Sequence, residues 1–245
     1  MTASEPDFSG RVALVTGASR GLGYAVARAL ALAGAHVLLV GRTQGALEAL
    51  YDDIRANGGE ATGVPMDVTD GDALDRLGAA VAERWGRLDL LVGNAGELGP
   101  ITPVSHIAPE AFEKALAVNV TANARLIRAM EPLLLQAEAP RAVFVTSGAA
   151  GKARAFWGAY ATSKAALDAM VRTWAHEHEN DALRVNLLSP GPCARRCAPS
   201  HAWRRPRIHC PLPLMLRRCF WNCCRRRKNA LAKSFDLCVD AYLSS

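Results

Sequence analysis

The chain has 245 residues, of which 50% are hydrophobic and 21% are charged. This balance excludes a disordered chain, and the length suits one substantial α/β domain. The acidic start lacks a basic segment followed by a long apolar run, and no stretch reaches the roughly 18 apolar residues of a membrane span. We therefore expect a cytoplasmic protein with no signal peptide and no membrane contact.

The net charge of +6 conceals two regions of opposite sign. Residues 193–245 carry twelve Lys/Arg and two Asp/Glu, whereas residues 1–192 carry 17 basic and 21 acidic side chains. A basic protein usually suggests a polyanionic partner, but here the basicity is confined to one segment. The same segment holds all seven cysteines, namely Cys193, Cys197, Cys210, Cys219, Cys223, Cys224 and Cys238. We therefore divide the chain into a folded domain, 1–192, and an anomalous tail, 193–245.

Residues 1–192 alternate between short apolar runs and helix-length segments. The runs predict strands over 11–17, 35–41, 88–94, 141–147 and 183–189, as in a parallel sheet buried on both faces, and a weaker candidate over 60–67 supplies a further strand. The segments between them predict helices over 21–34, 43–57, 70–85, 109–136 and 157–179. In the first helix, a stripe of Ala25, Ala29, Leu32 and Ala33 is expected to face the sheet. The alternation predicts a single α/β domain with a doubly wound parallel sheet, the Rossmann fold.

A glycine-rich loop, "TGASRGLG" at 16–23, follows the first predicted strand and opens the first helix. Gly17 permits a tight turn, Gly21 lets the backbone approach a pyrophosphate, and Gly23 lets the helix pack near the strand. The free N–H groups of the helix then attract phosphate. This context favours dinucleotide binding over a merely structural turn.

With its TGxxxGxG spacing, the loop resembles that of the short-chain dehydrogenase/reductase family, and the resemblance runs through residues 11–192. It implies that Asp67-Val68 contacts adenine, that Asn94-Ala95-Gly96 lines the cofactor and that Pro190-Gly191 closes over the nicotinamide. The family usually has "NNAG" where this chain has Gly93 first. The expected cofactor-binding residues are Gly17, Ser19, Arg20, Gly21, Leu22, Gly23, Arg42, Asp67, Val68, Asn94, Ala95, Gly96, Tyr160, Lys164, Pro190 and Gly191.

The end of the second predicted strand indicates which cofactor is bound. A carboxylate there would bond the adenosine ribose and repel a 2′-phosphate. The chain has Gly41 at that place and Arg42 directly after it, and Arg20 lies in the glycine loop. Guanidinium groups bind phosphate in a bidentate fork, so NADP(H) is favoured over NAD. The alternative is that both arginines are solvated surface charges.

Tyr160 and Lys164, in "YATSK", lie four residues apart and therefore on one face of a predicted helix. Hydride transfer to a carbonyl leaves an alkoxide that needs a proton. A free tyrosine phenol, with a pKa of about 10, is a poor base at neutral pH, but a nearby ammonium and the nicotinamide cation favour its phenolate. By the resemblance, Lys164 also hydrogen-bonds the nicotinamide ribose.

Two more residues complete the family's catalytic tetrad. Ser147 ends the fifth predicted strand, thirteen residues before Tyr160, where its hydroxyl can hold the substrate oxygen. Asn119 lies within a predicted helix and matches the residue to which the family's water-mediated proton path is credited. Each of these residues alone has a structural explanation, but their joint order and spacing favour a site.

Other candidates carry weaker signals. His176 and His178 are two residues apart, so they do not share a helical face, and a solvated helix end is favoured over a metal site. Trp157 can line the substrate pocket or pack in the core.

The tail has four competing explanations. The pairs Cys193/Cys197 and Cys219/Cys223 permit zinc, although zinc sites usually have tighter spacing. Disulfides conflict with a cytoplasmic protein. The charge permits a nucleic-acid arm, which we disfavour because phosphate attraction alone is unspecific. We favour a shifted reading frame.

The genetic code supports the shifted frame. One base restored ahead of Cys193 turns Cys-Ala-Arg-Arg-Cys into codons that allow Val-Arg-Thr-Ala-Met, a turn of the kind the family has after its Pro-Gly. Such a slip would remove the nicotinamide-closing turn, the substrate lid and the last strand, and would place the family's usual homo-oligomer in doubt. Sequencing of codons 188–200 that found no missing base would contradict this hypothesis.

The sequence thus predicts an NADP(H)-dependent oxidoreductase that interconverts a carbonyl and a secondary alcohol of a small molecule. The alternatives are a nucleotide-binding protein without activity and, more remotely, a nucleic-acid binder acting through the tail.

Overall fold

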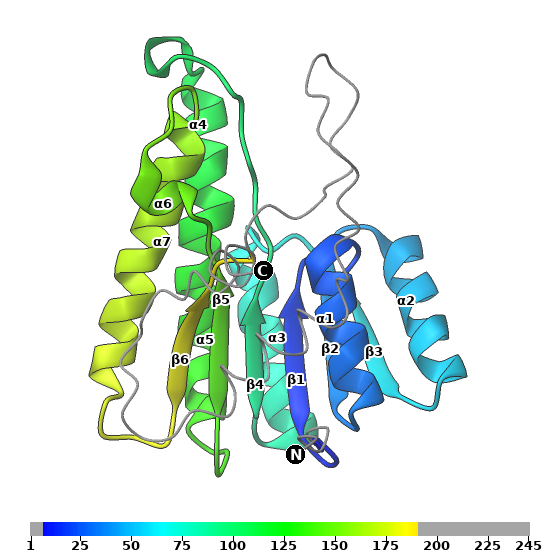
Figure 1. Cartoon of the computed structure of the whole chain (residues 1–245). Helices are drawn as coiled ribbons and strands as arrows, with labels where there is room; N and C mark the ends of the chain where they lie inside the picture. The colour runs from blue at the N-terminus through cyan, green and yellow to red at the C-terminus, as the bar shows by residue number, and fades with distance from the viewer. Residues whose placement is uncertain (1–6, 191–245) are drawn as a thin grey trace, which may run out of the picture.

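The computed structural model describes residues 7–190 (Figure 1). Within that range, six strands form one sheet in the order β3-β2-β1-β4-β5-β6, and every neighbouring pair is parallel. The strands are β1 (Val12–Thr16), β2 (His36–Gly41), β3 (Glu60–Pro65), β4 (Leu90–Gly93), β5 (Arg141–Val145) and β6 (Arg184–Leu188). The order reverses between β1 and β4, so the predicted doubly wound sheet is confirmed.

Helices cover both faces of the sheet, with α1 and α2 on one and α3, α5 and α7 on the other (Figure 1). The α-helices are α1 (Gly21–Leu32), α2 (Gln44–Ala56), α3 (Gly71–Trp85), α4 (Pro109–Leu116), α5 (Ala122–Leu134), α6 (Ala149–Lys152) and α7 (Gly158–Glu177). Two shorter turns are η1 (Val104–His106), a 3-10 helix, and η2 (Ala117–Thr121), a π-helix.

Alternate residues of each strand enter two separate hydrophobic cores. In β1, Ala13 and Val15 pack toward α1 and α2, whereas Val12 and Leu14 pack toward α3, α5 and α7. Both sets are almost completely buried. This two-sided burial is the physical reason why the strands read as uninterrupted apolar runs.

The face predicted for the first helix is wrong. The side of α1 that is buried comprises Gly23, Val26, Ala27, Leu30 and Ala31, whereas Leu32, assigned to the sheet with Ala25, Ala29 and Ala33, is 38% exposed. Gly23 decides the orientation, because a Cβ at this residue would lie 2.3 Å from the carbonyl oxygen of Gly17. The residues one and two turns later then face the sheet with it.

The single helix predicted over 109–136 is also wrong in detail. The segment consists of α4, the π-turn η2 and α5 in succession. A π-turn inserts an extra residue into the helix and frequently marks a functional site. Here it contains Asn119.

The remaining predictions fall partly outside the described residues. The described residues do not include Gly191 or the tail 193–245 with its cysteines and basic side chains. The division at residue 192 and the shifted frame therefore stay predictions. In the part of the chain from 7 to 190, no helix combines the length and the apolar character that crossing a membrane requires.

Candidate active site

The carboxyl ends of the strands meet at one edge of the sheet and bring the predicted residues together. Arg42 follows β2, Asp67 follows β3, Asn94 follows β4 and Ser147 follows β5, while Gly17 begins the loop after β1. Ligands of doubly wound sheets bind at this edge, in the crevice where the strand order reverses. That crevice lies between β1 and β4.

Thr16 and Asn94 join the ends of β1 and β4. The hydroxyl of Thr16 donates to the carbonyl of Val92 (3.3 Å) and accepts from the backbone N–H groups of Asn94 (2.9 Å) and Ala95 (3.0 Å). The side-chain amide of Asn94 donates to the carbonyls of Thr16 (2.9 Å) and Gly17 (3.2 Å). These bonds hold the glycine loop against the predicted Asn94-Ala95-Gly96 segment.

The glycine loop has backbone conformations that favour glycine at two positions. Gly17 and Gly21 have φ angles of +65° and +60°, a conformation that favours glycine, and a Cβ at Gly21 would meet nothing within 4 Å. Arg20 precedes α1 without capping it through its side chain, and the first turn contains no acidic residue. The N–H groups of this turn therefore suit an anion, with the predicted contacts Ser19 and Leu22 half-buried beside them.

Arg42 and Asp67 lie next to each other on the far side of this loop. Their side chains are 61% and 43% exposed, and Nη1 of Arg42 lies 3.8 Å from Oδ2 of Asp67. Hydrogen bonds from the N–H and hydroxyl of Thr69, at 2.9 and 2.8 Å, hold the pKa of Asp67 below its usual value, and Arg42 adds to the effect. A Cβ at Gly41 would lie 3.6 Å from that of Ser19, so position 41 adjoins the glycine loop, and as a glycine it places no carboxylate there.

Asn119 is fully buried in η2 and bridges two segments. Its Oδ1 accepts from the N–H of Glu97 (2.9 Å), and its Nδ2 donates to the carbonyl of Glu97 (2.8 Å) and to the hydroxyl of Ser163 (2.8 Å). The backbone carbonyl of Asn119 accepts from Nδ2 of Asn123 (2.9 Å). The π-turn thereby fastens the loop after β4 to α7.

Tyr160 and Lys164 lie one turn apart on α7, as predicted, and both are buried. Nζ of Lys164 donates to the carbonyl of Val145 (2.8 Å) and lies 6.0 Å from the centroid of the Tyr160 ring. A Cβ at Gly96 would lie 3.5 Å from this Nζ and 3.2 Å from Oδ1 of Asn119, so the cofactor segment reaches the tetrad.

Ser147 lies two residues beyond β5, because the strand ends at Val145 and not at 147 as predicted. Its hydroxyl accepts a hydrogen bond of 3.3 Å from the N–H of Ala149, the first residue of α6.

Two predicted cofactor-binding residues remain. Val68 packs against the core on the α3 side, and Pro190 is half-buried two residues after β6. The described predicted residues thus all lie at or next to one edge of the sheet.

The end of α7 differs from the expected solvated end. His176 is exposed, but His178 is buried: its Nδ1 lies 2.5 Å from Oδ2 of Asp181, and its Nε2 lies 3.6 Å from Oε2 of Glu131. The same oxygen of Glu131 accepts from Nε1 of Trp174 at 2.7 Å. These contacts join α7 to α5 at the end away from the tetrad.

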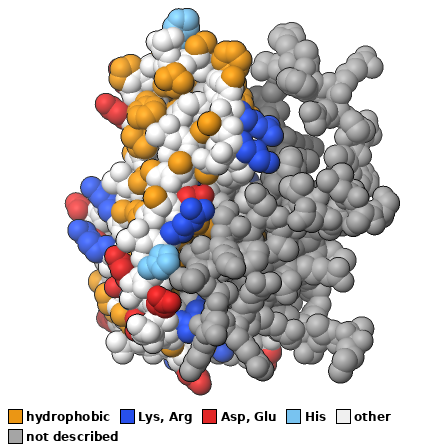
Figure 2. Space-filling model, turned by 60° about the vertical axis from the view of Figure 1, so that its left-hand side comes forward, with side chains coloured by type: hydrophobic (Ala, Val, Ile, Leu, Met, Phe, Trp, Pro, Cys, Tyr) orange, Lys and Arg blue, Asp and Glu red, His pale blue; other side chains and the backbone are white. Residues whose placement is uncertain are grey.

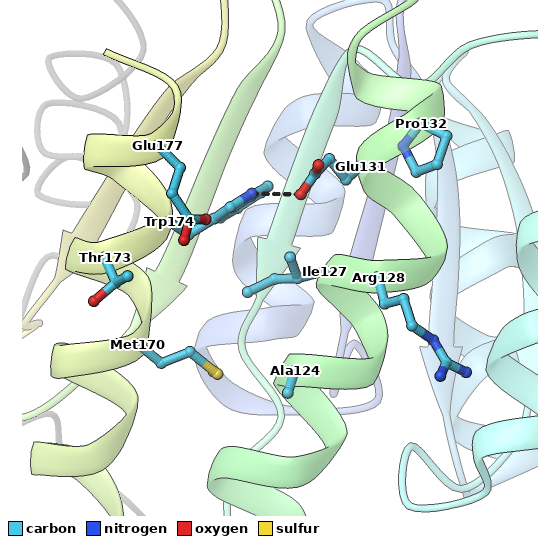
Figure 3. A pocket seen from close by; sticks show the side chains of 9 residues that line it. All are labelled: Ala124, Ile127, Arg128, Glu131, Pro132, Met170, Thr173, Trp174 and Glu177. Atoms are coloured by element: carbon cyan, nitrogen blue, oxygen red, sulfur yellow. Dashed lines mark hydrogen bonds between the residues drawn. The ribbon is translucent and has the colours of Figure 1, made fainter.

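A hollow of about 500 Å³ lies between α5 and α7 and not at the tetrad (Figure 3). Figure 3 shows Trp174 bonded to Glu131 across it, with Ile127 and Met170 nearby and Arg128 pointing away. Its walls belong to helix surfaces, so it does not change the assignment of the site. The lining residues are Ala124, Ile127, Arg128, Glu131, Pro132, Met170, Thr173, Trp174 and Glu177.

Exposed apolar side chains flank the approach to Tyr160. Val104 is 73% exposed, Ile101 58% and Phe156 54%, and Figure 2 shows hydrophobic side chains gathered on the upper part of this face. Phe156 has a φ of +70°, which is strained for an aromatic residue. Its carbonyl accepts from the N–H of Thr102 (3.0 Å), and the half-buried Trp157 ring lies 6.0 Å from that of Tyr160.

Thr16, Asn123 and Ser163 were missed by the sequence analysis. Ser163 was within reach of the pattern, because it lies inside "YATSK", three residues after Tyr160. Thr16 also lies within the quoted loop motif, but its three contacts arise only when β1 and β4 become neighbours. Asn123 gave no signal, since its role depends on the carbonyl that the π-turn leaves available.

Comparisons with known proteins agree with this geometry. A model of the short chain dehydrogenase family matches residues 11–202. The oxidoreductase YciK of Escherichia coli K12 is 36% identical over 184 residues, which cover 74% of this chain and 73% of that protein. The 2,3-dihydro-2,3-dihydroxybenzoate dehydrogenase of Bacillus subtilis is 35% identical over 184 residues, which cover 75% of this chain and 70% of that protein. The crystal structure of a short chain dehydrogenase from Escherichia coli CFT073, complexed with NADPH, superposes with a TM-score of 0.74 at 35% identity, covering 77% of this chain and 80% of that one.

Proposed function

Because this chain belongs to the short-chain dehydrogenase family, we propose that it is an NADP(H)-dependent oxidoreductase that interconverts a carbonyl group and a secondary alcohol. The observation that carries the proposal is the placement of Lys164. Its Nζ is held by the carbonyl of Val145 at 2.8 Å, in a buried position 6.0 Å from the Tyr160 ring. Lys164 and Tyr160 therefore lie one turn apart on one buried face of α7, which is the placement that acid–base exchange by a tyrosine with a neighbouring ammonium requires.

Each residue of the tetrad then has one role. Bound NADPH supplies the hydride. Tyr160 gives its phenolic proton to the substrate oxygen during reduction and takes it back during oxidation, and Lys164 stabilises the phenolate in between. The hydroxyl of Ser147 donates to the same oxygen and holds it beside Tyr160. Asn119 keeps the loop after β4 in register with α7 and serves the water path to Lys164.

Three observations favour NADP(H) over NAD. Gly41 replaces the carboxylate that would repel a 2′-phosphate, and the exposed guanidinium of Arg42 follows it directly. Arg20 adds a second guanidinium in the glycine loop. The related Escherichia coli CFT073 protein was crystallised with NADPH. We assign the 2′-phosphate to Arg42 and Arg20, and the pyrophosphate to the first turn of α1.

The test is a Tyr160→Phe variant assayed for NADPH oxidation on a panel of aldehydes and ketones. We expect kcat to fall by about 10²- to 10⁴-fold, the usual contribution of acid–base catalysis, while NADPH still quenches tryptophan fluorescence. Tyr51→Phe is the matched control, because Tyr51 is 36% exposed on α2, and we expect it to behave like the parent.

Unchanged turnover of the Tyr160→Phe variant would refute the role of Tyr160. Quenching by NADPH without turnover of any carbonyl by the parent chain would instead favour the non-catalytic nucleotide-binding protein. If turnover appears only after the reading frame is restored, the inactivity of the parent chain is caused by its tail.

A further inference from the structure

Two residues of α7 hold two consecutive residues at the end of β5. Lys164 donates to the carbonyl of Val145, and one turn later the carboxylate of Asp168 accepts a short hydrogen bond from the hydroxyl of Thr146 through its Oδ1. Residues 160, 164 and 168 share one helical face. The face that carries Tyr160 therefore also holds the backbone immediately before Ser147.

The contact between Thr146 and Asp168 is buried, with the two residues 3% and 8% exposed. A buried carboxylate is costly unless it is hydrogen-bonded, so its retention needs a reason. Arg172 lies one turn further, with Nη2 at 3.9 Å from Oδ2 of Asp168, but its side chain is 48% exposed and the ion pair is largely solvated. The hydroxyl of Thr146 is thus a buried hydrogen-bond partner of this carboxylate.

Ser147 directly follows the residue that makes this contact. The strand has ended at Val145, and the Ser147 hydroxyl has a hydrogen bond of 3.3 Å to Ala149. Thr146 is fixed on two sides, because its N–H also donates to the carbonyl of Leu188 in β6 at 2.9 Å. The orientation of the next residue follows from that of Thr146.

We propose that Asp168 and Thr146 are positioning residues, which fix the Ser147 hydroxyl relative to Tyr160 through their shared hydrogen bond. The proposal rests on the proposed function, since it assigns these residues to the same site. A misplacement of about 1 Å can lower a rate by about 100-fold, so a bond that locks the backbone next to Ser147 has a measurable effect on turnover.

The experiment is a double-mutant cycle of Thr146→Val and Asp168→Ala, with kcat, KM and NADPH quenching measured for each variant. We expect each single change to lower kcat at least tenfold. The NADPH dissociation constant should stay within about twofold, because neither side chain is assigned to the cofactor. The double variant should be no slower than the slower single variant, since both changes delete one shared interaction.

Two further variants separate positioning from folding. Thr146→Ser keeps the hydrogen-bond donor and Asp168→Asn keeps the acceptor. Both should therefore have a kcat much closer to that of the parent than Thr146→Val and Asp168→Ala have. Thr173→Val is the matched control: it removes a hydroxyl from the exposed side of the same helix, where it bonds the carbonyl of Ala169 at 3.1 Å, and should change nothing. The proposal would be overturned if the kcat losses of the two single variants multiplied in the double variant. It would also be overturned if the KM for NADPH changed and kcat did not.

A readout without turnover keeps this proposal distinct from the proposed function. Amide hydrogen exchange at residues 147–150 should be faster in Thr146→Val than in the parent, while exchange in β2 stays unchanged. If neither the parent chain nor its frame-restored form turns over a carbonyl, the proposed function fails, and exchange alone then decides. Unchanged exchange at 147–150 would overturn the proposal.

Discussion

A Gly23→Ala substitution probes the closest backbone approach at the candidate site. The new Cβ would lie 2.3 Å from the carbonyl oxygen of Gly17 and 2.4 Å from Nδ2 of Asn94. Restoring ordinary van der Waals contact requires a displacement of roughly 1 Å. Gly17 and Asn94 are joined to each other and to Thr16, so the loop cannot yield at one atom alone.

The expected destabilisation is the balance of three contributions. Overpacking costs about 1–3 kcal/mol, and disturbing the two hydrogen bonds of the Asn94 amide costs about 1 kcal/mol each. Alanine in a helix returns less than about 1 kcal/mol. We therefore expect the free energy of unfolding to fall by about 2–4 kcal/mol. Because the loop that receives the pyrophosphate moves, the affinity for NADPH should fall at least about tenfold.

Urea unfolding followed by circular dichroism measures the first effect, and fluorescence quenching measures the second. Gly45→Ala is the matched control, since a Cβ at Gly45, in the first turn of α2, would meet nothing within 4 Å. That variant should gain up to about 1 kcal/mol and bind NADPH like the parent. A Gly23→Ala protein as stable as the parent, with unchanged NADPH affinity, would refute the close-approach argument.

Three further predictions concern charged side chains. Arg42→Ala should weaken NADPH binding about 10- to 100-fold and NADH binding less than about threefold, as measured by titration; equal losses would contradict recognition of the 2′-phosphate by Arg42. Trp174→Phe should lower the free energy of unfolding by about 2 kcal/mol, since Glu131 loses a donor at 2.7 Å, and an unchanged urea midpoint would contradict that. The hydrogen bond from Arg28 holds the pKa of Asp53 below its usual value, so its contribution to stability is present above the unfolded pKa, near 4, and is lost as pH falls through the folded pKa. Asp53→Asn should therefore melt below the parent at pH 7 and converge with it under acid; a gap that persists at low pH would contradict this assignment.

Local patterns were sufficient for the architecture and for the order of the motifs. Five of the six strands are apolar on both faces, so uninterrupted runs such as "ALVT" identify them without tertiary information, whereas the edge strand β3 is partly exposed. The loop "TGASRGLG" and the spacing of Tyr160 and Lys164 are local too, because a turn and a helical face are set by nearby residues. These features place the candidate cofactor loop and half of the tetrad from the sequence alone.

Patterns failed where the outcome depended on distant partners. The first helix is apolar on most sides, so its buried face was decided by the approach of Gly23 to Gly17 rather than by periodicity. The π-turn at Asn119 gave no local signal, although it aims the Asn119 amide at Glu97 and Ser163. The sequence predicted that His178 lies at a solvated helix end, but it is buried between Glu131 on α5 and Asp181 just beyond α7.

The sequence by itself determined the alternation of the six strands with the main helices, because burial on two faces, glycine turns and helical spacing act over a few residues. Tertiary structure alone decided that Thr146 meets Asp168, that Asn94 ties β4 to the glycine loop and that Lys164 bonds the carbonyl of Val145. The physical reason is that a hydrogen bond forms between atoms about 3 Å apart, and only the assembled sheet and helices bring atoms so far apart in the chain to that distance.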